Sequence, residues 1–169
     1  MAGLYALAGA AFVYARGYSS VFSGNEIWKE AEISIALTAG VVLLLTLLTA
    51  WFLSMRKAQS KGEIFWNPVT KRWLVNLAIP LMAGGLLMLI FVLKNQWEWL
   101  PGLALIFYGL SLVNAGKFTY DEIRSLGIIQ LILGLAAARY PALGLVFWVI
   151  GFGLMHIIYG LYMHLKHEK

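Results

Sequence analysis

A single histidine inside a long apolar run has the clearest potential for chemistry in this sequence. His156 lies in the stretch FGLMHIIYG, and an ionisable side chain at membrane depth is costly unless it has a partner. A neutral imidazole carries one donor and one acceptor, so we predict that His156 points into the protein and meets a polar group from another helix. Because an unperturbed histidine titrates at about pH 6.5, it is a candidate pH switch if water reaches it from the cytoplasmic side. The simpler alternative is a neutral histidine that only links helices.

Three amides inside apolar runs are the most suitable partners for His156. Asn76 and Asn114 lie toward the ends of their runs that we assign to the cytoplasmic side, whereas Gln130 is central in its run. If these side chains face His156, they form a polar pocket open to that side. If they do not, each makes a separate interhelical hydrogen bond worth about 1 kcal/mol.

Pro80, followed by Gly84 and Gly85, is the candidate for a broken helix. Proline frees a backbone carbonyl and the glycines weaken the next turn, and in transporters such a break can create a binding site at the middle of the membrane. The alternative is a kink that only fits the helix to its neighbours.

Motifs for catalysis or cofactor binding are not found beside these residues. The sequence has no cysteine, which excludes disulfides and thiolate-bound metals. All carboxylates lie in connections or at the ends of apolar runs, and there is no HExxH or GxSxG motif. His164 and His167 follow His156 in the same run, so they cannot approach a haem iron from its opposite face. We therefore expect no enzyme activity, no cofactor and no metal.

Six long apolar runs must position these residues. Of the 169 residues, 61% are hydrophobic and only 12% are charged, well below the roughly 25% charged residues of soluble proteins. Most runs approach the roughly 20 residues that cross about 30 Å of hydrocarbon. We predict an all-α integral membrane protein, a single transmembrane domain over 1–169 whose six helices form three hairpins. The predicted helices span 2–22, 33–54, 68–93, 99–116, 120–140 and 142–165.

The first of these runs is the weakest candidate for a membrane span. Its continuous apolar part ends at Arg16, which is short for a crossing of the hydrocarbon. We expect the start of the chain to be shortened relative to its relatives.

The basic residues predict the orientation. Nine lie on the connections after the second and fourth runs or in the tail: Arg56, Lys57, Lys61, Lys71, Arg72, Lys117, Arg124, Lys166 and Lys169. The opposite side holds four, which are Arg16, Lys29, Lys94 and Arg139. The positive-inside rule then places both termini in the cytoplasm, in a bacterial inner membrane. The net charge of +5 is thereby explained by orientation, so we expect lipid and not nucleic acid as the partner.

Glycines recur with the same spacing in two of the predicted hairpins. Gly109 and Gly116 in the fourth run match Gly153 and Gly160 in the sixth, and Gly134 in the fifth matches Gly85 in the third. Glycines seven residues apart lie on nearly one face of a helix and let neighbouring backbones approach closely. We therefore predict helix packing at Gly109, Gly116, Gly134, Gly153 and Gly160, and a likeness between the last two hairpins.

The stretches LIFYGLSLVNAGKFTYDEIRSLGIIQLILGL and GLVFWVIGFGLMHIIYGLYMH resemble small uncharacterised multi-pass bacterial membrane proteins. This resemblance covers nearly the whole chain and implies no particular activity. A fainter likeness, through hairpins with apolar–Gly–Leu–Pro patterns, is to the HdeD-like acid-resistance membrane family.

Together these observations predict a noncatalytic membrane protein with a structural, stress-associated or partner-binding role. Its protein partner would be a second copy of the chain or another membrane protein. The alternative is a small-molecule or ion transporter or channel, with a polar site near the cytoplasmic half of the bundle. The two differ in whether His156, Gln130, Asn76 and Asn114 line one cavity or face separate helix seams.

Overall fold

The computed structural model of the chain describes residues 2–17, 29–60, 66–119 and 121–167, and these contain helices but no β-strand. The α-helices are α1 (Ala2–Ala15), α2 (Lys29–Ser60), α3 (Pro68–Leu93), α4 (Leu100–Ala115), α5 (Asp121–Arg139), α6 (Gly144–Trp148) and α7 (His156–His167). A π-helix, Val149–Met155, joins α6 directly to α7. Short 3-10 turns flank α4 and precede α6, at Trp97–Trp99, Gly116–Phe118 and Pro141–Leu143.

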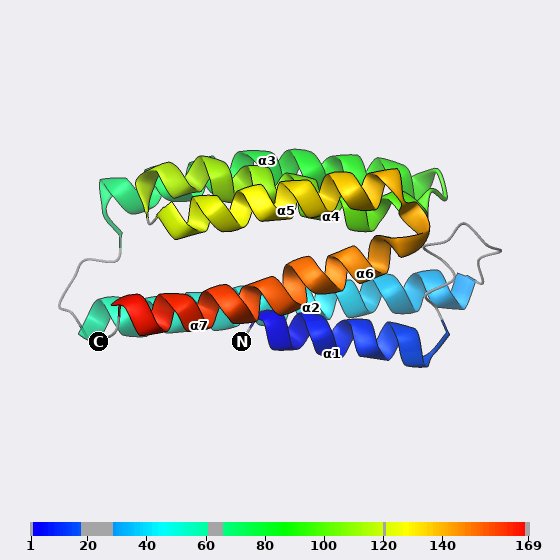
Figure 1. Cartoon of the computed structure of the whole chain (residues 1–169), viewed down its shortest axis with the longest axis horizontal. Helices are drawn as coiled ribbons and strands as arrows, with labels where there is room; N and C mark the ends of the chain where they lie inside the picture. Colours follow the sequence, from blue (N-terminus) through cyan, green and yellow to red (C-terminus); the bar gives the residue numbers. More distant parts are fainter. Residues whose placement is uncertain (1, 18–28, 61–65, 120, 168–169) are drawn as a thin grey trace.

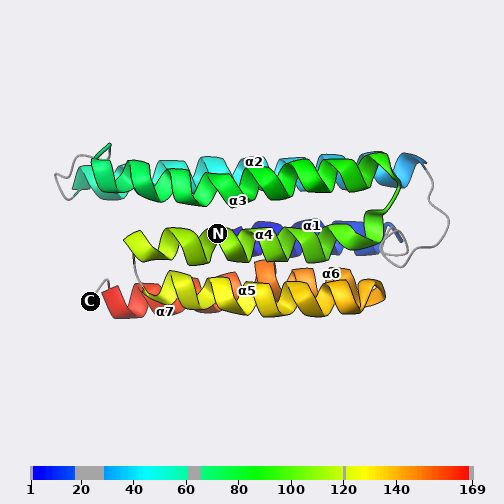
Figure 2. The same ribbon diagram turned by 90° about the horizontal axis from the view of Figure 1, so that it is seen from above.

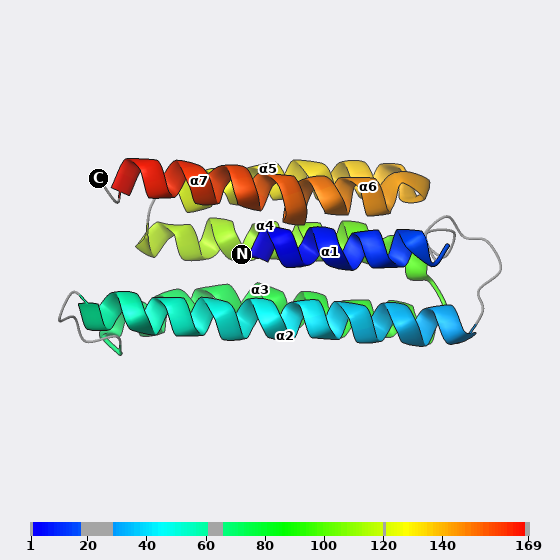
Figure 3. The ribbon, with the colours of Figure 1, turned by 90° about the horizontal axis from the view of Figure 1, so that it is seen from below.

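The helices form two layers. One layer holds α3, α4 and α5 side by side, and the other holds α2, α1 and the continuous run from α6 to α7 (Figure 1). Views from above and below show that α3 lies over α2, α4 over α1, and α5 over α6 and α7 (Figures 2 and 3). The chain therefore runs along the long axis of the molecule in every helix, and it reverses direction between consecutive helices except from α6 through the π-helix to α7, which form one continuous run.

Helix α4 is the best-buried of the long apolar helices because it lies in the middle of its layer. Its most extensive contact is with α5, followed by that with α3. Helix α1 holds the equivalent place in the other layer, between α2 and the π-helix. Its inner face carries small residues, of which Gly3, Ala6 and Ala10 are buried.

The two layers are joined by an apolar cluster at one end. Val13 of α1, Ile35 of α2 and Trp97 of the turn before α4 are buried together, and partly buried Leu145 of α6 packs against them. In Figure 1 this is the end where the layers converge. At the opposite end, where α5 begins and α7 ends, the layers lie farther apart.

Helix α3 begins where the sequence predicts. Asn67 is its N-cap and accepts a hydrogen bond of 2.8 Å from the backbone N–H of Thr70. Pro68 takes the first helical position, where its missing N–H leaves no bond unmade. The observed bounds equal the predicted range of 68–93.

Four helices among the described residues are long and apolar enough to cross a membrane. They are Ile33–Leu53, Pro68–Leu93, Trp97–Phe118 and Pro141–Lys166. Helix α1 is described for only 14 residues, and the remainder of the predicted run 2–22 lies partly outside the described residues. Helix α5 carries charged residues at both ends, Asp121 and Glu122 in its first turn and Arg139 in its last.

Six spans in three hairpins therefore remain a prediction, and the packing groups the helices in another way. The closest pair, α4 and α5, belongs to two different hairpins of the predicted scheme. Layers describe the arrangement better than hairpins do.

Candidate functional site

His156 lies at the centre of a hydrogen-bonded chain between three helical segments. Its Nε2 atom is 2.8 Å from the Tyr108 hydroxyl of α4, and its Nδ1 atom is 2.9 Å from the Gly151 carbonyl oxygen of the π-helix. The same carbonyl oxygen accepts a hydrogen bond of 2.8 Å from Nε2 of Gln130 in α5. We refer to Tyr108, Gln130, Gly151 and His156 as the His156 cluster.

The geometry assigns the tautomer of His156. A carbonyl oxygen can only accept, so Nδ1 carries the hydrogen that it donates to Gly151. In the neutral ring Nε2 is then the acceptor, and the Tyr108 hydroxyl donates to it. A carbonyl oxygen has two lone pairs, so the donors of His156 and Gln130 together fill those of Gly151.

The π-helix and its glycines make this arrangement sterically feasible. A Cβ atom at Gly151 would lie 2.4 Å from Cδ2 of Leu105 and 2.5 Å from Oε1 of Gln130, so only glycine fits there without displacement. The backbone N–H of His156 bonds to the Gly153 carbonyl, and the Gly151 carbonyl accepts from the two side chains. Short π-helical segments of this kind interrupt α-helices, and they are frequent at functional sites.

Aromatic rings cover the cluster. Phe152 stacks on the His156 imidazole with a centroid distance of 5.7 Å and an interplanar angle of 14°. Its ring centroid is also 5.0 Å from that of Tyr108 and 5.1 Å from that of Trp148. Gln130 is fully buried, and its Oε1 atom has no hydrogen-bond partner.

The asparagines do not join the His156 cluster, which corrects the predicted direct pairing with His156. Nδ2 of Asn76 donates to the Arg72 carbonyl oxygen of its own helix at 2.8 Å. Nδ2 of Asn114 in α4 donates across to the Asn76 carbonyl oxygen in α3 at 3.1 Å. Gln130 is in the cluster but meets His156 only through the shared Gly151 acceptor, so the direct partner is the Tyr108 phenol.

Pro80 does not break its helix, contrary to the prediction of a broken helix. Helix α3 continues through Pro80 from Pro68 to Leu93. Proline has no N–H to offer to the carbonyl four residues earlier, which here belongs to Asn76. The Asn114 side chain supplies the missing donor from α4, so the bond that proline removes within the helix is replaced from outside it.

The two glycines after Pro80 do not form a hinge either. A Cβ at Gly84 would lie 2.4 Å from Cβ of Phe107, so Gly84 is a close contact with α4. A Cβ at Gly85 would have no atom of a neighbouring helix within 4 Å, so Gly85 faces open space.

Most of the glycines predicted for packing lie against a neighbouring helix. A Cβ at Gly109 would lie 2.7 Å from the Gly127 carbonyl oxygen, and one at Gly134 would lie 2.8 Å from the Ile106 backbone nitrogen. A Cβ at Gly116 would lie 3.0 Å from the Arg124 backbone nitrogen. These glycines bring α4 and α5 into backbone contact.

The sixth run fits the glycine prediction only in part. Gly153 packs on Leu7 of α1, where a Cβ would lie 2.6 Å from Cδ2. Gly160, in contrast, has nothing within 4 Å, so its predicted packing is wrong for the described residues. The π-helix contains Gly153 and ends before Gly160, so a spacing of seven no longer places both on one face, as it would in a regular α-helix.

Sequence reasoning missed Tyr108 and the π-helix, and it left Gly102 and Gly127 out of the α4–α5 seam. Gly127 faces Gly109 reciprocally, and a Cβ at Gly102 would lie 3.1 Å from the Ala138 backbone nitrogen. The spacing of Gly102 to Gly109, seven residues like that to Gly116, was a usable signal for this face. The π-helix has no comparable signal beyond two glycines shortly before His156.

Metal binding has no side-chain cluster to support it among the described residues, where no group of three or more histidines or carboxylates lies together. The donors of the His156 cluster are instead a phenol, an amide and an imidazole, and all three are used in the contacts between helices described above. The arrangement can hold a proton on His156 and can fix three helical segments relative to one another.

Comparison of the chain with protein-family models, with curated proteins and with solved structures gives no match. The class of the protein is defined by its fold: an all-helical protein with four candidate membrane spans among the described residues.

Proposed function

We propose that the chain is a noncatalytic multi-pass protein of a bacterial inner membrane, with both termini in the cytoplasm and a structural, stress-associated or partner-binding role. The observation that supports this role is the use of the polar side chains inside the apolar helices. Asn114 satisfies the carbonyl that Pro80 leaves open, and His156 and Gln130 satisfy the Gly151 carbonyl. The Asn114 contact and the His156 contacts lie in two separate seams between helices. This separation supports a role for the polar side chains in stabilising the bundle and not in lining one transport pathway.

Lipid is the first partner of such a protein. Helices α2 and α3 bury hardly any of their apolar windows within the chain, and the side chains that they expose are large and hydrophobic, such as Leu44, Trp51 and Leu89. In water this surface would be an aggregation hazard, whereas in a bilayer it is the ordinary lipid-facing surface of a span. A protein partner in the membrane would use the same surface.

The orientation is testable with single cysteines, since the natural sequence has none. Lys117→Cys and Gln96→Cys lie at opposite ends of α4, at exposed positions. An impermeant maleimide applied to intact cells and to inverted vesicles should label them from opposite sides, with Lys117→Cys labelled only from the cytoplasmic face. Labelling of both from one face would contradict the proposed topology.

A small-molecule or ion transporter is the second candidate, favoured by one observation. The irregular π-helix lies beside Oε1 of Gln130, a buried oxygen without a partner, and irregular backbone at membrane depth marks many transport sites. Purified protein in liposomes that enclose a pH-sensitive dye separates the two proposals. The structural role predicts proton leakage equal to that of empty liposomes, whereas a leak that His156→Phe abolishes would favour proton transport.

A further inference from the structure

A hollow of about 480 Å³ lies between the start of α5 and the end of α7, at the end of the molecule where the two layers lie farther apart (Figure 1). This is the end to which the sequence assigns most of the basic residues. The residues that carry the argument come from both helices: Asp121, Glu122 and Ser125 from α5, and Ile158, Tyr162 and Lys166 from α7.

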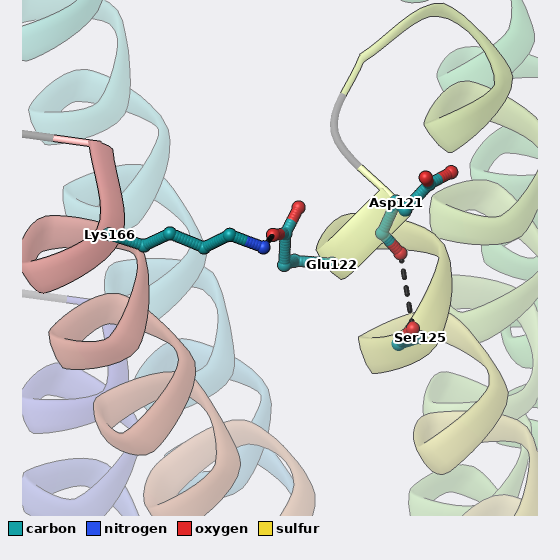
Figure 4. Close-up of polar contacts among 4 residues, drawn as sticks. All are labelled: Asp121, Glu122, Ser125 and Lys166. Atoms are coloured by element: carbon teal, nitrogen blue, oxygen red, sulfur yellow. Dashed lines mark hydrogen bonds and ion pairs between the residues drawn. The ribbon is translucent and has the colours of Figure 1, made fainter.

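Charges of both signs face this hollow. The Lys166 ammonium reaches across from α7 to pair with Glu122 in the first turn of α5 (Figure 4). The Lys166 side chain remains 49% exposed, whereas that of Glu122 is only 13% exposed. Lys166 therefore keeps donor capacity for a ligand while the carboxylate stays at the wall.

Neutral donors and aromatic rings complete the lining. Ser125 brings a hydroxyl that donates to the Asp121 carbonyl oxygen at 3.1 Å, and Tyr159 and Tyr162 bring phenol groups. Lys166 lies 5.6 Å from the centroid of the Tyr162 ring, within the range of cation–π attraction. The same rings can attract a second ammonium group, one that belongs to a ligand.

The polarity of the hollow changes along α7. Ile158, Tyr162 and Lys166 are spaced by four residues and share one face of the helix, from an apolar level to a charged one. Lys166 is also the last residue of the candidate span Pro141–Lys166, so the charged level coincides with the head groups of a bilayer. Exposed Leu154 and Ile158 extend an apolar surface from the hollow toward the interior of the membrane.

We propose that this hollow binds the head group of a phospholipid that carries both a phosphate and a primary amine, such as phosphatidylethanolamine. The phosphate lies against the Lys166 ammonium, the amine lies against Glu122 and the tyrosine rings, and an acyl chain follows Leu154 and Ile158. A purely anionic head group would meet the Glu122 carboxylate, and a purely cationic ligand would meet the Lys166 ammonium. The depth of the site and the apolar surface below it favour a lipid over a soluble zwitterion of the same chemistry.

The test is a lipid titration of the purified, detergent-solubilised full chain followed by native mass spectrometry. Phosphatidylethanolamine should bind more tightly than phosphatidylglycerol, which lacks the amine, and than phosphatidylcholine, whose quaternary amine cannot donate hydrogen bonds. Lys166→Met should weaken phosphatidylethanolamine binding about tenfold, the loss expected for one charge-assisted hydrogen bond. The matched control Lys117→Met removes a basic residue at the same end, outside the hollow, and should leave the affinity unchanged.

Each other outcome overturns the proposal. Equal affinity for the three lipids, or equal losses for Lys166→Met and Lys117→Met, would mean that lipid binds without this site. Binding of water-soluble glycerophosphoethanolamine as tightly as the whole lipid would assign the hollow to a soluble ligand. Circular dichroism checks the fold, and Glu122→Gln, which keeps size and shape, replaces Lys166→Met if that variant does not fold. The inference goes beyond the proposed function, and neither topology labelling nor proton leakage depends on its result.

Discussion

The contact between Asn114 and the Asn76 carbonyl predicts that Asn114 matters only because Pro80 is present. Asn114→Leu removes the donor at 3.1 Å and leaves a backbone oxygen unsatisfied where lipid cannot hydrate it. We expect a loss of about 1 to 2 kcal/mol in the free energy of unfolding, between the mean for interhelical hydrogen bonds in membranes and the cost of an unsatisfied buried acceptor.

Pro80→Ala restores the backbone N–H that reaches the same oxygen within α3. In that background the Asn76 carbonyl keeps a partner after Asn114→Leu, so the second substitution should cost about 0.5 kcal/mol or less. The double-mutant cycle should therefore give a coupling free energy of about 1 kcal/mol between residues on two different helices.

Reversible unfolding in mixed micelles of dodecyl maltoside and sodium dodecyl sulfate, followed by circular dichroism, measures all four variants. Asn76→Leu is the matched control, because its side chain bonds only to the Arg72 carbonyl of its own helix among the contacts that the structure gives it. Its cost should be the same with Pro80 and with Pro80→Ala. If Asn114→Leu also costs the same in both backgrounds, Asn114 does not compensate for the proline and the reasoning is refuted.

Three further outcomes are expected. Tyr108→Phe should lower the unfolding free energy by about 1 kcal/mol. Nitrogen-15 NMR of the parent protein at neutral pH should find the His156 proton on Nδ1, and a proton on Nε2 would contradict the assigned tautomer. Gly109→Ala should destabilise by about 1 to 3 kcal/mol through overpacking of α4 on α5, whereas Gly160→Ala, with open space around it, should be neutral or stabilising; equal effects would remove the packing argument. Gly151→Ala should destabilise by a similar amount of about 1 to 3 kcal/mol, because its Cβ would meet two side chains at 2.4 and 2.5 Å, and unchanged thermal unfolding would show that the π-helix adapts at little cost.

Local signals predicted those helix boundaries that are set by local chemistry. Helix α3 begins at Pro68 after an asparagine cap, and helix α5, observed as Asp121–Arg139, matches the predicted range 120–140 closely. Helix α2 extends beyond 33–54 at both ends, to Lys29 and Ser60, because hydropathy marks only the apolar part of a helix. The layered packing follows from which faces meet, and the periodicity of separate helices does not contain that information.

The polar contacts were predictable in kind but not in partner. That His156 meets a polar group from another helix follows from the cost of leaving an imidazole unpaired in lipid. The partner, Tyr108, has a mostly apolar ring with one polar atom, so it reads as part of an apolar run. The acceptors on Gly151 and Asn76 are backbone carbonyls, which every residue has, and only the three-dimensional structure distinguishes those that accept a hydrogen bond from a side chain.

The number of residues in the π-helix sets the rotation of α7 relative to the rest of the protein. Each residue of a regular helix turns the chain by about 100°, so one residue added between Val149 and Met155, where the π-helix already holds wider turns than an α-helix, would rotate α7 as a whole against the rest of the protein. His156 would leave Tyr108 and Lys166 would leave Glu122 in the same event, although the two contacts lie near the middle and at the end of the molecule. Substitutions in this segment act locally, whereas an insertion of one codon there acts on the entire C-terminal helix.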